Sequence, residues 1–103
     1  VMEMDRVAET GIREQVIMEI CEIAKRCQVD KVLLFGSRAR GDFKRTSDID
    51  LAVAGGDFLR FALDVEEETS TLLEFDIVDL NRCMQQELRD SIEKEGRVIY
   101  EKV

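Results

Sequence analysis

The stretch that decides the fold is residues 35–53, which read FGSRARGDFKRTSDIDLAV. It begins at the end of an apolar run, Lys31–Phe35, that is typical of a buried strand. Its second half extends into SDIDLAVA, residues 47–54, which predicts another strand closed by a Gly-Gly turn signal. The connection between the two, residues 38–46, is too short for a crossover helix. We therefore expect the strands to be antiparallel neighbours, with a short helical turn at Gly36-Ser37.

Three segments have the apolar spacing of amphipathic helices, with hydrophobic residues every three or four positions. The first covers residues 10–28, and its opening threonine is a plausible N-cap. In the second, Asp57 is the N-cap, the apolar stripe runs to Leu72, and Asp64 lies on the opposite, polar face. The third covers residues 81–95 and ends at a glycine.

Two further segments are predicted strands. Residues 74–80, EFDIVDL, lie between the second and third helices, and residues 98–100 add a short terminal strand. The resulting order is helix, strand, strand, helix, strand, helix, strand. It predicts a single α/β (α+β) domain over residues 1–103, with helices packed on a small mixed sheet.

The composition narrows the class of protein. The chain has 103 residues, 45% of them hydrophobic, and 15 Lys+Arg against 23 Asp+Glu give a net charge of −8. Nucleic-acid phosphates and anionic membrane surfaces both attract basic proteins. No apolar run approaches the ~20 residues of a membrane-spanning helix, and the first residues lack the apolar stretch of a signal peptide. We therefore expect a soluble protein that binds neither membranes nor nucleic acid directly.

The cysteines and the absence of histidine limit the available chemistry. Cys21, Cys27 and Cys83 form no CxxC pair, and the chain has no histidine. Neither a disulfide framework nor a zinc site is indicated, so a reducing cytoplasm is the expected compartment. Without histidine, catalysis has to use carboxylates, hydroxyls or a metal ion held by oxygen ligands.

Two acidic residues and a Gly-Ser pair within residues 35–53 are candidates for a nucleotide site. Asp48 and Asp50 stand two positions apart on a predicted strand, so their carboxylates leave the same face about 7 Å apart at the backbone. Their mutual repulsion is relieved by Mg²⁺, which is commonly held by one or two carboxylates plus substrate phosphates. Gly36 and Ser37 follow a buried strand, where backbone N–H groups and a missing side chain admit a phosphate. Together they predict a site for a nucleoside triphosphate with Mg²⁺.

Other charged residues extend this candidate site. Arg38 and Arg40 are either cations that complement a triphosphate or plain surface charges. Within EFDIVDL, an acid in an apolar strand is costly unless it has a partner or a function. Asp76 is taken as the third carboxylate because it has apolar neighbours on both sides, and Asp79 is the second choice because it lies nearer the strand end.

With these residues in place, the sequence resembles the nucleotidyltransferase superfamily that includes polymerase beta and the aminoglycoside nucleotidyltransferases. The resemblance is carried by Gly36-Ser37, ten residues, Asp48-x-Asp50, and Asp76 on a later strand. The segments GSRARG, SDIDLAV, FDIVDL and EGRVIYE are similar to those of the smallest members, the minimal nucleotidyltransferases (MNT type). The resemblance extends over nearly the whole chain from about residue 10.

The resemblance implies a nucleotidyltransferase fold and a two-metal mechanism. Asp48 and Asp50 would hold two Mg²⁺ ions on the triphosphate of ATP, while Gly36 and Ser37 would bind its β- and γ-phosphates. Arg38 also fits the GSRARG loop of the family and would be among the nucleotide-binding residues. Asp76 would hold one metal and help to deprotonate an acceptor hydroxyl. That hydroxyl attacks the α-phosphorus in line, and pyrophosphate leaves.

The resemblance also implies a partner. Minimal members are similar to antitoxins paired with a HEPN-domain ribonuclease toxin, onto whose tyrosine they move AMP from ATP. Two alternatives stay open: a binding module that neutralises the toxin without catalysis, and a small-molecule nucleotidyltransferase completed by a second polypeptide. The sequence does not fix the nucleotide base or the oligomeric state, and its composition is compatible with a homo-oligomer.

Overall fold

The structure is a computed structural model that describes residues 9–82 and 84–102. In chain order the elements are α2 (Glu14–Arg26), β1 (Lys31–Phe35), α3 (Ser37–Arg40), β2 (Ile49–Ala54), α4 (Phe58–Glu68), β3 (Phe75–Asp79), α5 (Gln86–Glu95) and β4 (Arg97–Glu101). This order confirms the predicted α/β class. Cys83, one of the three cysteines considered above, lies outside the described residues.

The four strands form one mixed sheet in the order β3-β2-β1-β4. β1 pairs antiparallel with β2, as the short connection predicted, and β3 pairs parallel with β2. The carboxyl end of β1 therefore meets the amino ends of β2 and β3 at one edge of the sheet. At that edge Phe35, Asp50 and Asp76 are opposite one another in adjacent strands.

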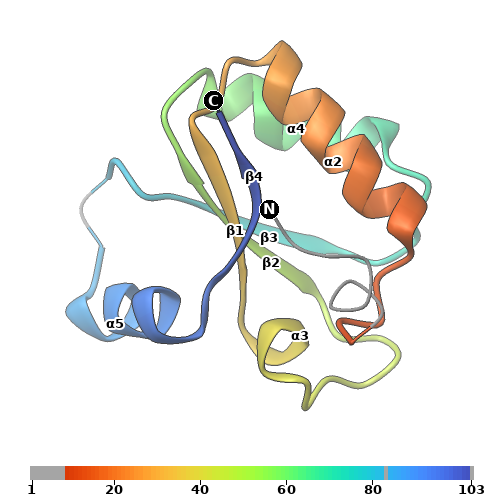
Figure 1. Cartoon of the computed structure of the whole chain (residues 1–103), viewed down its shortest axis with the longest axis vertical. Coiled ribbons are helices and arrows are strands. Elements are labelled where there is room, and N and C mark those ends of the chain that lie inside the picture. Colours follow the sequence, from red (N-terminus) through yellow and green to blue (C-terminus); the bar gives the residue numbers. More distant parts are fainter. Residues whose placement is uncertain (1–8, 83, 103) are drawn as a thin grey trace.

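Alternation along the strands divides the apolar residues between two faces of the sheet. Leu51 and Val53 of β2 belong to the larger core, which also contains the buried sides of α2 and α4. Ala52 of β2 and Val78 of β3 pack with Ile92 of α5 in a smaller second core. Figure 1 shows α2 and α4 lying together on one side, with α5 well separated from them. The sheet is thus covered unevenly, and the face toward α5 is the one that carries Asp50.

The first helix starts later than predicted. α2 begins at Glu14 with Arg13 in the N-cap position, so Thr10 is not the cap. The Thr10 hydroxyl instead accepts a hydrogen bond of 3.2 Å from the Ile12 N–H. Gly11, with φ of 68°, separates Thr10 from the helix and sends the chain into a turn that the apolar periodicity does not register.

α4 ends earlier than predicted, and the predicted environments of Leu72 and Asp64 are wrong. The helix stops at Glu68, since Thr69 is extended. Leu72 therefore lies beyond the helix and is fully exposed instead of joining the core. Asp64 is buried instead of solvated, because Arg26 of α2 and Arg60 contact its carboxylate at 3.0 and 3.3 Å. The Asp57 cap is confirmed, with its carboxylate accepting from the Arg60 N–H.

The last helix also begins later than predicted, at Gln86 instead of near residue 81. The chain after β3 is held in a turn, where the Asp79 carboxylate accepts a hydrogen bond from the Asn81 N–H at 2.9 Å. The Asn81 side chain in turn accepts from the Gly55 N–H. Among the described residues, no helix has the length and apolar character needed to traverse a bilayer.

Candidate active site

The Gly36 turn connects β1 to the short helix α3 and shapes one wall of the site. Gly36 occupies the N-cap position with φ of 75°, a conformation that non-glycine residues rarely adopt. A Cβ added there would lie 2.2 Å from Oδ2 of Asp50. The backbone of Gly36 therefore packs directly against that carboxylate, which explains why this position needs glycine. Ser37, half-buried, opens the helix, where the first N–H groups have no partner within the helix.

The three predicted carboxylates gather at the sheet edge described above. Asp50 is half-buried on β2 and stands in register with Asp76 on β3, while Asp48 precedes β2. Asp48 and Asp76 are exposed. Burial of Asp50, followed by the negative charges of Asp76 and Asp48, raises its pKa from 3.8 to about 6. The three side chains thus interact electrostatically, as a shared site requires.

As placed, these side chains do not close around an ion. In the part of the chain that the structure describes, no three acidic or cysteine side chains are grouped so that they could hold a metal. The donor set nevertheless fits Mg²⁺. Carboxylate oxygens are its usual protein ligands, and a cation would offset both the burial of Asp50 and its repulsion by Asp76 and Asp48, which together raise its pKa. Side-chain rotation at the two exposed aspartates, Asp48 and Asp76, is the movement that ligation would require.

The two arginines of the GSRARG loop have different environments, which the sequence could not distinguish. Arg38 is 2% exposed and faces into the protein. Its guanidinium donates hydrogen bonds to the carbonyls of Ser47, Thr10 and Arg45 at 3.0, 2.9 and 3.2 Å. It also lies over the Phe43 ring, 4.9 Å from the centroid. In this structure the Arg38 side chain holds the loop together from inside and is not a plain surface charge, while its role in nucleotide binding stays a prediction.

Arg40 is the arginine whose charge reaches the carboxylates. Its positive charge acts to lower the pKa of Asp50, against the effects of burial and the neighbouring acids. The side chain is exposed and forms ion pairs with Asp42 at 3.2 Å and with Glu95 of α5 at 2.9 Å. Sequence reasoning missed Glu95, because nothing in the local pattern of α5 indicates contact with a residue 55 positions earlier.

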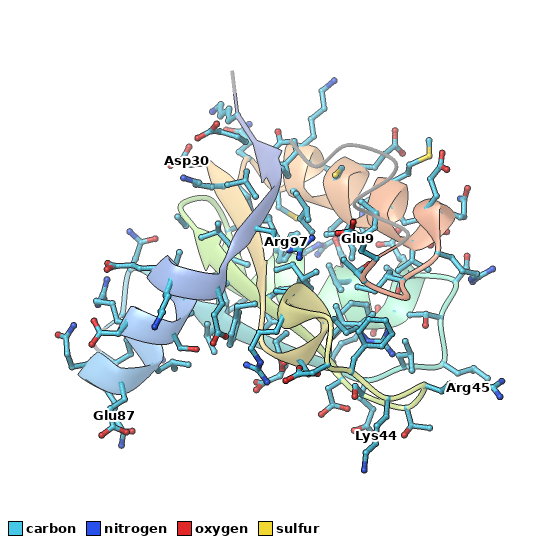
Figure 2. All side chains as sticks on the ribbon, turned by 60° about the horizontal axis from the view of Figure 1, so that its bottom comes forward. Glu9, Asp30, Lys44, Arg45, Glu87 and Arg97 are labelled. Atoms are coloured by element: carbon cyan, nitrogen blue, oxygen red, sulfur yellow. The ribbon has the colours of Figure 1, made fainter. Side chains whose placement is uncertain are left out.

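The loop between α3 and β2 presents two more cations at its surface. Lys44 and Arg45 are exposed, and Figure 2 shows both side chains pointing away from the protein. The Lys44 N–H donates to the Ser47 hydroxyl at 2.8 Å, which closes the turn just before Asp48. The loop is therefore ordered from inside by Arg38 and presents its other charges to solvent.

A separate hollow of about 500 Å³ lies at the opposite end of β2. Arg26, Arg60 and Asp64 are among the residues that line it. Both arginines are engaged by the buried carboxylate of Asp64, and Arg26 also contacts Glu68 at 2.7 Å. The arginines of this hollow are thus neutralised by carboxylates of the protein itself. We therefore place the candidate active site at the other end of β2, around Asp50.

Comparisons with known proteins agree with this geometry. Residues 15–103 match the family described as "Polymerase beta, Nucleotidyltransferase". A protein from Methanocaldococcus jannaschii that is named as a protein adenylyltransferase is 31% identical over 100 residues, covering 84% of this chain and 97% of that protein.

Solved structures share the fold. A toxin-antitoxin structure with AMP-PNP superposes with a TM-score of 0.63 at 24% identity, covering 84% of this chain and 73% of the other. A structure from Sulfolobus solfataricus described as a nucleotidyltransferase gives 0.51 at 21% identity, covering 94% and 88%. The chain belongs to the polymerase beta nucleotidyltransferase family, and its enzyme class is that of a nucleotidyltransferase.

Proposed function

We propose that this protein is a Mg²⁺-dependent antitoxin that transfers AMP from ATP to a tyrosine hydroxyl of a HEPN ribonuclease toxin in the cytoplasm. The observation that carries the catalytic part is the meeting of Asp48, Asp50 and Asp76 with the Gly36 turn at one sheet edge. A pure binding module has no use for three carboxylates that repel one another. A catalytic site needs them.

The proposed roles follow from where the residues lie. Gly36 offers backbone without a side chain, and Ser37 adds a hydroxyl and the first N–H groups of α3, which suits the β- and γ-phosphates of ATP. Asp48, Asp50 and Asp76 would hold the Mg²⁺ ions. When bound, Mg²⁺ supplies charge neutralisation on the triphosphate and lowers the pKa of an oxygen that it contacts.

The acceptor hydroxyl must lose its proton as it attacks the α-phosphorus, while the bond to pyrophosphate breaks. Asp76 is suited to help remove that proton, because its carboxylate is exposed at the edge of the site and the chain has no histidine. Asp50 is half-buried and packs against Gly36, so its side chain is less free to move than that of Asp76. It therefore suits a role in which it only binds the metal.

The nature of the acceptor rests on the relatives and on charge. The archaeal relative carries the name of a protein adenylyltransferase, and structural neighbours are described as toxin-antitoxin complexes. With a net charge of −8, the chain is electrostatically complementary to a ribonuclease that binds RNA through basic residues. Both facts support a protein acceptor over RNA or DNA.

The test is transfer of label from α-phosphate-labelled ATP, in Mg²⁺, to the HEPN protein proposed as its partner. We expect label on the partner with the wild-type chain, and a loss of about 1000-fold or more with Asp48→Asn. Neutralisation of the toxin without any labelling would instead favour the non-catalytic binding module. Labelling of a small molecule such as an aminoglycoside, with none on the HEPN protein, would favour the small-molecule enzyme.

Gly36→Ala should impair the site through one contact. The added Cβ would collide with the Asp50 carboxylate, 2.2 Å away, and displace it. We expect label transfer to fall about 100-fold, as is typical for a misplacement of about 1 Å. The matched control is Gly41→Ala, which has φ of 93° but no atom within 4 Å of the added Cβ. Equal activity of the two variants would contradict the role of the Gly36–Asp50 contact.

A further inference from the structure

A groove of about 450 Å³ lies beside the carboxylates, where α4 ends and β3 begins. Leu72, Leu73 and Phe75 supply its apolar lining, and Glu66 and Glu74 supply carboxylates. Phe75 directly precedes Asp76, and the carbonyl of Glu74 accepts a hydrogen bond of 2.9 Å from the Ile49 N–H, one residue beyond Asp48. The groove is therefore near the amino end of β3, on the α4 side of the sheet, and the Asp76 side chain lies across the same strand from Phe75.

The chain that leads into this groove is held in place by hydrogen bonds. The turn at Ser70 is tied to α2, because Glu19 accepts hydrogen bonds from the Ser70 N–H and hydroxyl at 2.8 and 2.6 Å. Arg13 donates to the Ser70 carbonyl as well. Just beyond this anchored turn, Leu72 is fully exposed. Together with Leu73 and Phe75 it forms a contiguous apolar surface bordered by Glu66 and Glu74, and such a surface is typical of an interaction site.

The charges of the groove indicate what it binds. Glu66 and Glu74 are exposed, and within the described residues neither forms an ion pair. β3 is also the outermost strand on that side of the sheet, so its backbone can pair with an extended segment. A partner segment with an apolar side chain flanked by Lys or Arg complements all three features.

We propose that this groove docks an extended, basic segment of the acceptor protein, with an apolar side chain against Leu72 and cations against Glu66 and Glu74. Docking there would bring a nearby tyrosine hydroxyl to the Asp76 side of the site. The inference rests on the proposed function, since it names the surface by which the protein acceptor of that reaction is held.

The test varies the groove and measures steady-state kinetics of labelling with the HEPN partner as acceptor. Leu72→Ser combined with Glu74→Gln should raise the KM for the acceptor about tenfold and leave the KM for ATP unchanged. Because the proposed docking pairs Lys or Arg side chains of the acceptor with Glu66 and Glu74, the acceptor KM of the wild type should also rise with salt concentration. This dependence should be weaker in the variant.

The matched control is Leu59→Ser combined with Glu87→Gln, which makes the same chemical changes at exposed positions outside the groove. Figure 2 shows Glu87 at the far outer end of α5. We expect the control to behave as the wild type. If both double variants keep the wild-type KM for the acceptor, the docking site is overturned while the proposed function stands. If the wild type itself labels no protein, the proposed function fails and the docking inference fails with it.

Discussion

Asp50→Asn is expected to abolish nucleotide transfer and, in the same sample, to stabilise the metal-free protein at neutral pH. Transfer should fall about 1000-fold or more, because the central carboxylate of the site loses its charge. The stability gain follows from electrostatics. Burial and the charges of Asp76 and Asp48 raise the pKa of Asp50 to about 6, so ionising it costs more in the folded than in the unfolded chain.

This effect has a defined pH window. Below the unfolded pKa of 3.8, Asp50 is protonated in both states and imposes no penalty. As the pH rises toward the folded pKa of about 6, the stability contributed by the protonated group is lost, and the penalty is constant above that value. Because the side chain is only half-buried, solvent screening reduces the penalty to about 1 kcal/mol.

The measurement is thermal unfolding in a chelator. At pH 7.5 we expect Asp50→Asn to unfold about 5 °C above the wild type, and at pH 3.5 we expect the two to coincide. Asp42→Asn is the control, since it removes one negative charge from an exposed position in the neighbouring loop. An equal rise in that control would mean that net charge, not the cluster, is responsible. Adding Mg²⁺ should stabilise only the chains that retain Asp50.

The sequence predicted one part of the placement of this cluster, where the relevant information is local. A short connection between two strands favours antiparallel pairing, and the structure has this pairing with Phe35 opposite Asp50. The helix between β2 and β3 is compatible with the parallel pairing observed, but the register that places Asp76 beside Asp50 was not predicted from the sequence. The catalytic roles of these residues stay predictions.

Other features depend on contacts between distant residues, and sequence pattern could not supply them. Asp64 has the spacing of a solvated helix face, yet Arg26, 38 positions away, draws it into the interior. Leu72 fits an apolar stripe only if α4 continues to it, and the helix stops four residues earlier at Glu68. Arg38 and Arg40, two positions apart in GSRARG, illustrate the same limit, because their different environments are set by distant partners such as Thr10 and Glu95.

Replacing Arg38 is expected to produce the largest loss of stability of any single change in the loop. Arg38→Met keeps an apolar stem but removes every hydrogen bond to the carbonyls of Thr10, Arg45 and Ser47. One of these hydrogen bonds is buried and two are partly buried, and losing each costs about 1 kcal/mol, so a total of about 3 kcal/mol is expected. For a domain of this size that corresponds to a fall of about 15 °C in Tm. Arg38→Lys should rescue only part, because an ammonium cannot reproduce the planar fork.

The segment that unfolds first in Arg38→Met distinguishes Arg38, which holds the loop of residues 41–48, from an ordinary core residue. Arg38 connects the segment before α2 to both sides of the loop that leads into Asp48, and Gly11 is packed so closely that a Cβ there would lie 2.9 Å from the Arg38 guanidinium. Without the hydrogen bonds of Arg38 the loop should unfold first, so trypsin should cut after Lys44 and Arg45 well below the Tm of the variant.

Arg40→Met is the matched control for this prediction, since it removes a guanidinium from the same helix that makes only exposed ion pairs. Such pairs contribute about 0–1 kcal/mol, so its Tm and its resistance to trypsin should stay near those of the wild type. If Arg38→Met proved as stable and as resistant as Arg40→Met, the hydrogen bonds of Arg38 would not hold the loop. The position of Asp48 would then have to be set by the β2–β3 pairing alone.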